Sequence, residues 1–147
     1  MAKEIKKMKN VTVITNSIRV INELAGTEGI KVIATGGMVS NNQSLVGSSA
    51  ENYIEEQFFC DKMFFSSRGI GNGIGIMEGN EQEGFIKQKM LKNSNIHYYL
   101  FDISKVNKVG HIKLASFEDI EYIITDGKLD KKLCEIMSEN NVEVIKA

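Results

Sequence analysis

The clearest strand signal in the chain is Tyr98-Tyr99-Leu100-Phe101-Asp102-Ile103-Ser104-Lys105, an apolar and aromatic run that ends abruptly in a carboxylate, a hydroxyl and an amine. This pattern predicts a buried β-strand that opens onto a polar loop. In open α/β sheets, ligands bind just beyond the carboxyl ends of the strands, so Asp102, Ser104 and Lys105 are candidate ligand contacts. An ordinary polar turn is the alternative, and this stretch alone leaves both open.

Strand and helix patterns alternate on both sides of this stretch. Short β-branched or apolar runs predict strands at residues 11–14, 30–34, 62–65, 98–101, 122–125 and 142–145. Apolar residues spaced three and four apart predict helices at residues 1–10, 18–25, 48–58, 81–93 and 129–137. Such alternation is typical of right-handed βαβ crossovers. We therefore expect an α/β fold whose mostly parallel sheet is covered by helices on both faces.

Two segments are less regular. Residues 38–46 are polar and predict either a loop or a short antiparallel excursion. Residues 69–75 carry glycine at every second position, which predicts a loose loop whose backbone adopts positive φ or approaches another segment closely. Alternating glycines also occur in dinucleotide-binding loops, but that fingerprint needs a strand immediately before it and an acidic residue about 20 residues later. We therefore expect no nucleotide cofactor.

Composition excludes several classes of protein. A chain of 147 residues with 42% hydrophobic residues can form one domain with its own core. Its formal net charge of −1 lacks the basic excess of surfaces that bind nucleic acids or membranes. Cys60 and Cys134 are isolated from each other and from histidines at metal-ligand spacing, so we expect reduced thiols and no metal. No apolar run approaches the ~18 residues of a membrane span, and we expect a cytoplasmic protein.

Four predicted strands end in polar residues or glycines. These ends are residues 15–17, 36–37, 66–68 and 102–105. A parallel sheet would bring them to one edge, where hydroxyls, exposed amides and a lysine supply the donors and the positive charge that a phosphate needs. The favoured ligand is therefore a small, anionic molecule rich in hydroxyl groups.

Signals for catalysis are weak. His97 lies inside an apolar strand and is more typical of a hydrogen-bonded core or edge histidine than of a base, and His111 lies in a basic loop. Glu83 and Lys87 are spaced as a surface ion pair of a helix. Asp102 and Glu83 would act as an acid/base pair on a sugar phosphate only if the fold brings them together.

Several short motifs occur in a fixed order along the chain. They are Val13-Ile14-Thr15-Asn16-Ser17, Gly36-Gly37, Ser44-Leu45-Val46-Gly47, Asp61-Lys62 with Phe64, Gly69-Ile70, Glu83 followed by Lys87 and Met90, Asp102-Ile103-Ser104-Lys105, and Ile124-Thr125-Asp126. No motif is specific alone. Their order and spacing resemble the C-terminal effector-sensing domain of DeoR-family bacterial transcriptional repressors.

The resemblance implies a Rossmann-like domain related to ribose-5-phosphate isomerase, glucosamine-6-phosphate deaminase and CoA transferases. Such domains sense a phosphorylated sugar or related metabolite without converting it to a product. The resemblance therefore implies no catalytic residue and no cofactor. It also implies a homo-oligomer that contacts DNA only through an N-terminal winged helix-turn-helix. A sugar-phosphate isomerase or deaminase of the same fold is the alternative. The implied ligand contacts are Thr15, Asn16, Ser17, Gly36, Gly37, Lys87, Asp102, Ser104 and Lys105.

The resemblance also sets an expectation for domain organisation. Residues 1–147 would form a single effector-sensing domain. The winged helix-turn-helix module is missing, and so is the first strand of the sensing domain with its Asp-x-Gly-Thr-Thr loop, which should lie just upstream of the first predicted helix. Loss of that loop would remove one wall of the phosphate site.

Overall fold

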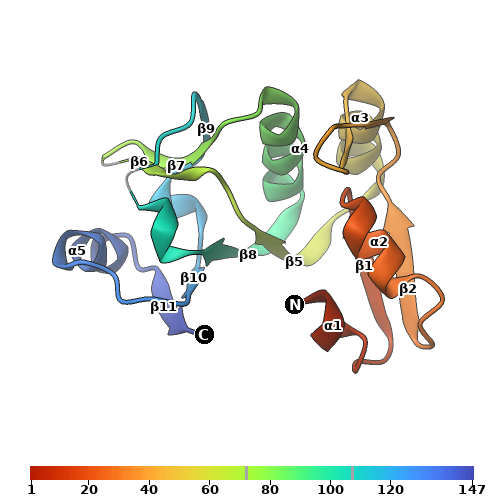
Figure 1. Ribbon diagram of the computed structural model, residues 1–147, viewed down its shortest axis with the longest axis horizontal. Helices are drawn as coiled ribbons and strands as arrows, with labels where there is room; N and C mark the ends of the chain where they lie inside the picture. The colour runs from red at the N-terminus through yellow and green to blue at the C-terminus, as the bar shows by residue number, and fades with distance from the viewer. Residues whose placement is uncertain (72, 107) are drawn as a thin grey trace. The chain divides into compact units, whose positions relative to one another are not determined.

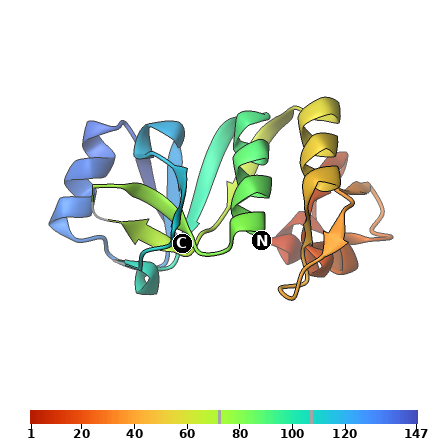
Figure 2. The same cartoon turned by 90° about the horizontal axis from the view of Figure 1, so that it is seen from above.

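The computed structural model describes residues 1–71, 73–106 and 108–147. The chain forms two compact units, Met1–Gln57 (unit 1) and Phe58–Ala147 (unit 2). In Figures 1 and 2, unit 1 runs from red to yellow and unit 2 from yellow-green to blue. Strands and helices alternate through both units, which confirms the predicted α/β class.

Unit 1 combines a parallel strand pair with a short antiparallel hairpin. Its elements are α1 (Ala2–Ile5), β1 (Val11–Thr15), α2 (Ile18–Leu24), β2 (Ile30–Ala34), β3 (Met38–Val39), β4 (Leu45–Val46) and α3 (Ser48–Gln57). β1 and β2 pair in parallel along their whole length. β3 and β4 pair antiparallel, so the antiparallel excursion is the alternative that forms within residues 38–46.

The first helix is shorter than predicted. α1 covers Ala2–Ile5 instead of residues 1–10, and none of its residues is buried. Met8, an apolar residue within the predicted helix, is 55% exposed, and Asn10 adopts a φ of 60°. A helix gains most of its stability from an apolar face that packs on the rest of the protein. This segment buries no such face, and the helix ends early.

Two side chains in the connection from β1 to α2 bind backbone N–H groups at the start of the helix. Ser17 directly precedes the helix predicted at residues 18–25, and serine is a favoured N-cap residue. It is the N-cap of α2, and its side chain accepts a hydrogen bond from the Val20 backbone N–H at 3.4 Å. The Thr15 hydroxyl accepts from the Ser17 backbone N–H at 3.1 Å. Side chains therefore satisfy backbone donors at the start of the helix, where no intrahelical partner exists.

Unit 2 is built on a four-stranded parallel sheet flanked by helices. Its elements are β5 (Cys60–Phe65), β6 (Gly69–Gly71), β7 (Gly75–Glu78), α4 (Glu81–Lys92), β8 (Ser94–Phe101), the 3-10 turn η1 (Ile103–Lys105), β9 (Ile112–Ala115), the 3-10 turn η2 (Phe117–Asp119), β10 (Tyr122–Thr125), α5 (Lys131–Glu139) and β11 (Glu143–Lys146). The strand order is β11-β10-β8-β5, and every pair is parallel. β8 therefore has a neighbour on each side.

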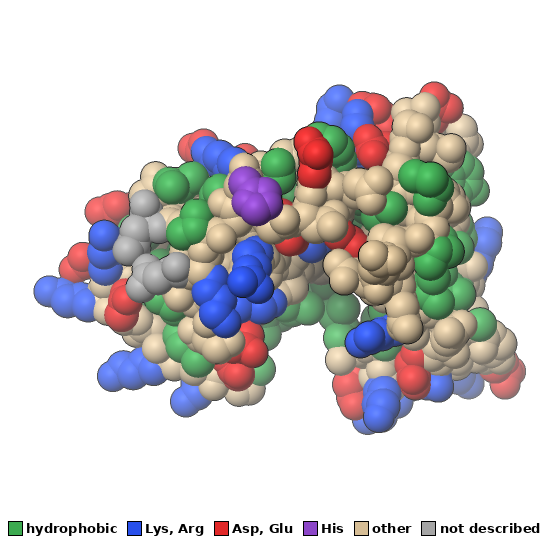
Figure 3. Space-filling view, turned by 45° about the horizontal axis from the view of Figure 1, so that its top comes forward, with side chains coloured by type: hydrophobic (Ala, Val, Ile, Leu, Met, Phe, Trp, Pro, Cys, Tyr) green, Lys and Arg blue, Asp and Glu red, His purple; other side chains and the backbone are tan. Residues whose placement is uncertain are grey.

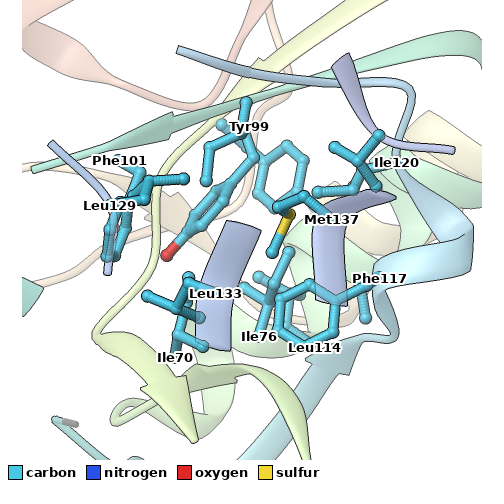
Figure 4. Packing of buried hydrophobic residues seen from close by; sticks show 14 of the residues in the cluster. Ile70, Ile76, Tyr99, Phe101, Leu114, Phe117, Ile120, Leu129, Leu133 and Met137 are labelled. Atoms are coloured by element: carbon cyan, nitrogen blue, oxygen red, sulfur yellow. The ribbon is translucent and has the colours of Figure 1, made fainter. Parts of the chain in front are cut away.

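The core of unit 2 forms on one face of this sheet. Tyr99 and Phe101 project from β8 into a cluster with residues of α5, β6, β7 and β9, as Figure 4 shows. On the opposite face, Tyr98 stacks between Phe64 and Tyr122, with ring centroids 4.7 Å and 4.6 Å apart. The alternation of side chains along β8 thus divides its aromatic residues between two faces.

The glycine-rich segment is a correction to the sequence prediction. Residues 69–75 were expected to form a loose loop, but β6 and β7 are buried strands of an antiparallel sheet with the order β6-β7-β9. Gly75 has a φ of 116°, and a Cβ there would lie 2.5 Å from the Ala115 carbonyl oxygen. The predicted positive φ and the predicted close approach of the backbone to another segment are thus confirmed. Both allow β7 to pack closely against β9. The part of this segment at Asn72 lies outside the described residues.

A buried hydrogen bond connects the parallel sheet to this glycine-rich segment. The Tyr99 hydroxyl lies 2.8 Å from the Ser67 hydroxyl, which donates to the Gly69 carbonyl oxygen at 3.2 Å. Because Ser67 uses its hydrogen on Gly69, Tyr99 is the donor between the two hydroxyls. Tyr99 is fully buried.

We expect Tyr99→Phe to lower the free energy of unfolding at pH 7 by about 0.5–1.5 kcal/mol, because it removes this hydrogen bond and keeps the ring. Urea denaturation would measure the change. Tyr122→Phe is the matched control, since it also removes a tyrosine hydroxyl and should change stability by less than about 0.5 kcal/mol. Equal stability of Tyr99→Phe and the wild type would contradict the assignment.

Tyr99 should also make stability depend on pH in the alkaline range. Burial raises the pKa of Tyr99 from 10.0 to about 12. The negative charge of Glu78 adds to this rise, and the Ser67 hydroxyl, which can turn to donate to a phenolate, opposes it. The fold favours the neutral phenol, so this contribution is complete below pH 10 and is lost as pH rises toward 12, by up to about 2.7 kcal/mol at 1.36 kcal/mol per pH unit. Denaturation across this range should show a steeper loss for the wild type than for Tyr99→Phe. Parallel curves would contradict the prediction.

Candidate functional site

Three strands of unit 2 end side by side, and each is followed by polar residues. The parallel registers place Phe65 opposite Tyr99 and Phe101 opposite Thr125. The segments that follow β5, β8 and β10 therefore begin at one edge of the sheet, which we call the carboxyl edge of unit 2. The sequence predicted that four strand ends would gather at one edge, and residues 66–68 and 102–105 do so here. Residues 15–17 and 36–37 instead follow the strands of the separate β1-β2 sheet, and Asp126 after β10 joins the carboxyl edge of unit 2.

Lys105 supplies a cation at this edge, and a hydrogen bond holds it there. Its half-buried side chain donates from Nζ to the Ser66 hydroxyl at 2.7 Å. Ser66 in turn donates to the Leu100 carbonyl oxygen at 2.9 Å. The chain of bonds fixes the ammonium beyond the end of β5, although its residue follows β8. Figure 3 shows Lys and Arg side chains grouped on one face, next to acidic ones.

Two carboxylates hold the turn that carries Lys105. Asp102 is the N-cap of η1 and accepts from the Ser104 backbone N–H at 2.8 Å. Asp126 accepts from the Ile103 backbone N–H at 3.2 Å. Hydrogen bonds from the Ser104 hydroxyl and backbone, together with the charge of Lys105, hold the pKa of Asp102 below its usual value. Asp102 is therefore an ionised acceptor at neutral pH.

Lys87 has a different kind of partner. Its ammonium lies 2.5 Å from Glu78 Oε2, in an ion pair between α4 and β7. The other oxygen, Glu78 Oε1, accepts from the Gly79 backbone N–H at 2.7 Å. The Glu78 side chain is 11% exposed and that of Lys87 22%. The sequence spacing suggests Glu83 as a partner of Lys87, and that pairing stays a prediction. The pair with Glu78 joins two elements and carried no local sequence signal.

The predicted ligand residues of unit 1 lie at the carboxyl ends of β1 and β2. Asn16 donates from its amide to the Leu45 carbonyl oxygen at 3.3 Å. Thr15 and Ser17 hold the start of α2, as described above. Gly36 and Gly37 have φ values of 71° and 98°, and a Cβ at Gly37 would lie 2.5 Å from the Val46 carbonyl oxygen. These residues shape the loops that follow β1 and β2.

Thr35, which lies immediately before the two glycines, was not among the predicted ligand contacts. Its side chain is 1% exposed, and its hydroxyl has no hydrogen-bond partner among the residues that the structure describes. A buried hydroxyl without a partner costs about 1–3 kcal/mol. Its signal in the sequence is only its place at the end of a predicted strand.

His97 is hydrogen-bonded to the backbone, as the sequence predicted. Nδ1 lies 2.8 Å from the Asp119 carbonyl oxygen, and Nε2 lies 3.0 Å from that of Leu91. A cavity of about 280 Å³ adjoins the ring and is lined by Gln88, Leu91, Lys92, His97, Leu114, Ala115, Asp119 and Glu121. His97 and Glu121 precede the carboxyl ends of β8 and β10, so this cavity is separate from the carboxyl edge.

The described residues show neither a metal centre nor a membrane span. Nowhere in residues 1–71, 73–106 and 108–147 do three or more His, Cys, Asp or Glu side chains gather as potential metal ligands. Across the same residues, no helix is long and apolar enough to cross a bilayer. The acid/base pair considered from the sequence stays a prediction: Asp102 caps η1, and Glu83 lies in the first turn of α4.

A parallel sheet with polar groups beyond its strand ends places the chain in the Rossmann-like class of α/β proteins. Residues 1–127 match the family model of the DeoR C-terminal sensor domain. The chain therefore belongs to the DeoR C-terminal sensor domain family, which confirms the resemblance seen in the sequence.

Similar proteins are regulators of transcription. The HTH-type transcriptional regulator YulB of Bacillus subtilis is 32% identical over 91% of this chain and 52% of its own length. The L-fucose operon activator of Haemophilus influenzae is 31% identical over 91% of this chain and 54% of its own. The HTH-type transcriptional repressor GlcR of Bacillus subtilis is 30% identical over 91% and 52%. The chain thus spans about half the length of these relatives.

We expect Lys87→Met to lower the free energy of unfolding by about 2 kcal/mol, because it leaves the buried Glu78 carboxylate without its counter-charge. The double variant Glu78→Gln/Lys87→Met should recover part of that loss, which urea denaturation of the full double-mutant cycle would measure.

The exposed pair of Lys131 and Glu135 provides the control for this cycle. Its atoms lie 3.6 Å apart, with side chains 92% and 59% exposed. Lys131→Met should change stability by less than about 1 kcal/mol. A loss in Lys87→Met no larger than in Lys131→Met would show that the Glu78–Lys87 pair adds nothing to the fold.

Proposed function

We propose that this chain is the effector-sensing domain of a DeoR-type transcriptional repressor and that its effector is a phosphorylated sugar. The observation that supports this most directly is the ammonium of Lys105, held at the carboxyl edge beside acidic acceptors in a domain of the DeoR sensor family. Sensing requires no turnover, so the proposal assigns no catalytic residue and no cofactor.

The chemistry of the carboxyl edge suits this class of ligand. A sugar phosphate presents an anionic group and several hydroxyls. An ammonium binds a phosphate oxygen through a charge-assisted hydrogen bond, and an ionised carboxylate accepts from hydroxyls. Lys105 supplies the first kind of group, and Asp102, with its lowered pKa, supplies the second.

The residues proposed to contact the effector are those predicted from the sequence. In unit 2 they are Lys87, Asp102, Ser104 and Lys105, and in unit 1 they are Thr15, Asn16, Ser17, Gly36 and Gly37. Lys87 would have to share its ammonium between Glu78 and the ligand. Lys105 has no such competing carboxylate in its hydrogen bond, because its partner there is a serine.

The regulatory part of the proposal rests on the relatives. One is named as an activator of an operon and another as a transcriptional repressor. We propose that the effector shifts a two-state equilibrium in a homo-oligomeric cytoplasmic protein, which requires different affinities for the two states. DNA would be bound by a helix-turn-helix module outside this chain, which fits its formal net charge of −1.

We further propose that residues 1–147 act as one sensing domain that lacks its first strand. The family model runs through both units. Within the described residues, the parallel sheet of unit 1 has only two strands, and a strand pair alone is marginally stable in water. An additional strand upstream of α1 would extend such a sheet and supply backbone donors near its carboxyl ends.

Calorimetric titration with a panel of hexose and pentose phosphates tests the function. We expect saturable binding to the protein extended upstream, loss of binding in Lys105→Ala, and unchanged binding in the exposed-residue control Lys128→Ala. Absence of binding to every phosphorylated sugar would overturn the proposal. Turnover of ribose 5-phosphate or glucosamine 6-phosphate would support the isomerase or deaminase alternative instead.

A further inference from the structure

The η1 turn is hydrogen-bonded to the residues that directly follow both strands flanking β8. It carries Ser104 and Lys105 and follows β8 directly. Toward β5, the Lys105 side chain bonds to Ser66, and toward β10, the backbone of Ile103 bonds to Asp126. A short turn held from two sides has little freedom to move without breaking one of these bonds.

The bond to Ser66 has a defined direction. A serine hydroxyl has one hydrogen, and Ser66 donates it to the Leu100 carbonyl oxygen at 2.9 Å. Its oxygen must therefore accept from Lys105 Nζ at 2.7 Å. A lysine side chain that is not held loses up to about 2 kcal/mol of rotamer entropy when it binds a ligand. Ser66 holds the ammonium at the carboxyl edge before any ligand arrives.

The Ser66 bond also leaves the charge of Lys105 available. The ammonium has three N–H donors, and among the hydrogen bonds in the described part of the chain Ser66 takes one. Serine is neutral, so this bond positions the charge without neutralising it. The remaining donors suit an anionic group.

The contact with β10 fixes the backbone of the turn. Asp126 accepts from the Ile103 backbone N–H at 3.2 Å, and Gly127 lies against the Ile103 side chain, where a Cβ would come within 2.8 Å of the Ile103 Cβ. Asp102 completes the arrangement, since it accepts from Ser104 and its carbonyl oxygen accepts from the Lys105 backbone N–H at 2.9 Å.

We propose that Ser66 and Asp126 are positioning residues that hold η1 from its two neighbouring strands and so place the Lys105 ammonium for an anionic group. Neither residue was among the ligand contacts predicted from the sequence. The ligand part of this inference rests on the proposed function. The positioning part concerns the free protein and is measured without a ligand.

The test combines two measurements on the chain of 147 residues. The first is the rate at which an acylating reagent labels Lys105, followed by mass spectrometry of the peptide. The second is amide hydrogen exchange at Ile103, followed by NMR. Both are repeated with inorganic phosphate and with ribose 5-phosphate as probes, and a thermal melt of each variant reports global stability.

Each position has a disruptive variant and a conservative one. Ser66→Ala should speed Lys105 labelling about 2- to 12-fold. This ratio corresponds to the loss of a hydrogen bond of about 0.5–1.5 kcal/mol. Ser66→Thr, which keeps the hydroxyl, should restore the wild-type rate. Asp126→Ala should speed exchange at Ile103 by the same range, and Asp126→Asn, which keeps a side-chain oxygen acceptor, should restore it. Ser138→Ala and Asp61→Ala are matched controls away from the turn.

The outcomes separate this inference from the proposed function. If Ser66→Ala leaves Lys105 labelling unchanged, or Asp126→Ala leaves Ile103 exchange unchanged, the positioning role is overturned. Changes at η1 without a shift in melting temperature support it, because a merely structural role would lower global stability. If these changes occur but neither probe protects Lys105 in the wild type, the positioning role stands and the proposed effector chemistry fails.

Discussion

β8 pairs in parallel with β5 on one side and with β10 on the other, and this double pairing determines where the chemistry of unit 2 gathers. Parallel registers align strand ends, so residues about 36 and 24 positions away from Asp102 along the chain, Ser66 and Asp126, come to the same edge. The inward side chains of β8 anchor the core that keeps the strand in place. β8 thus both aligns the strand ends at the carboxyl edge and anchors the core of unit 2.

The glycine-rich sheet depends on that strand as well. Tyr99 reaches from β8 to Ser67, and Ser67 bonds to the first residue of β6. Glycines then allow the backbones of β6, β7 and β9 to approach closely, since a side chain at Gly75 would collide with the Ala115 carbonyl oxygen. This packing buries the end of β7 and places Glu78 where it meets Lys87. The ion pair between α4 and β7 therefore depends on close backbone packing. Side chains in place of the glycines would prevent that packing.

Local patterns in the sequence predicted the features that depend on neighbouring residues. The apolar run of β8, the Ser17 cap and the helix at α4 all follow from composition and spacing over a few residues. The meeting of residues 66–68 and 102–105 at one sheet edge was also predicted, but other features that depend on distant contacts were missed or wrong. The glycine-rich segment looks loose and flexible in isolation, and its strands form because β9, about 40 residues later, pairs with β7. The pairing of Glu78 with Lys87 and of Asp126 with Ile103 is set by tertiary packing and leaves no periodic signal.

The two lysines predicted as ligand contacts differ in the charge of their partners, and this difference separates their roles. Lys87 binds a carboxylate that is almost buried, so its charge is compensated within the fold and removing either partner would leave an unpaired charge in a poorly solvated place. Lys105 binds a serine hydroxyl, which orients the ammonium and leaves its charge to act on whatever reaches the carboxyl edge. An incoming anion would therefore gain more from Lys105 than from Lys87, where it must compete with Glu78. Coulombic attraction at short range favours the cation that is not paired with a buried carboxylate, so the contact most able to distinguish an anionic effector from a neutral sugar is the one at Lys105.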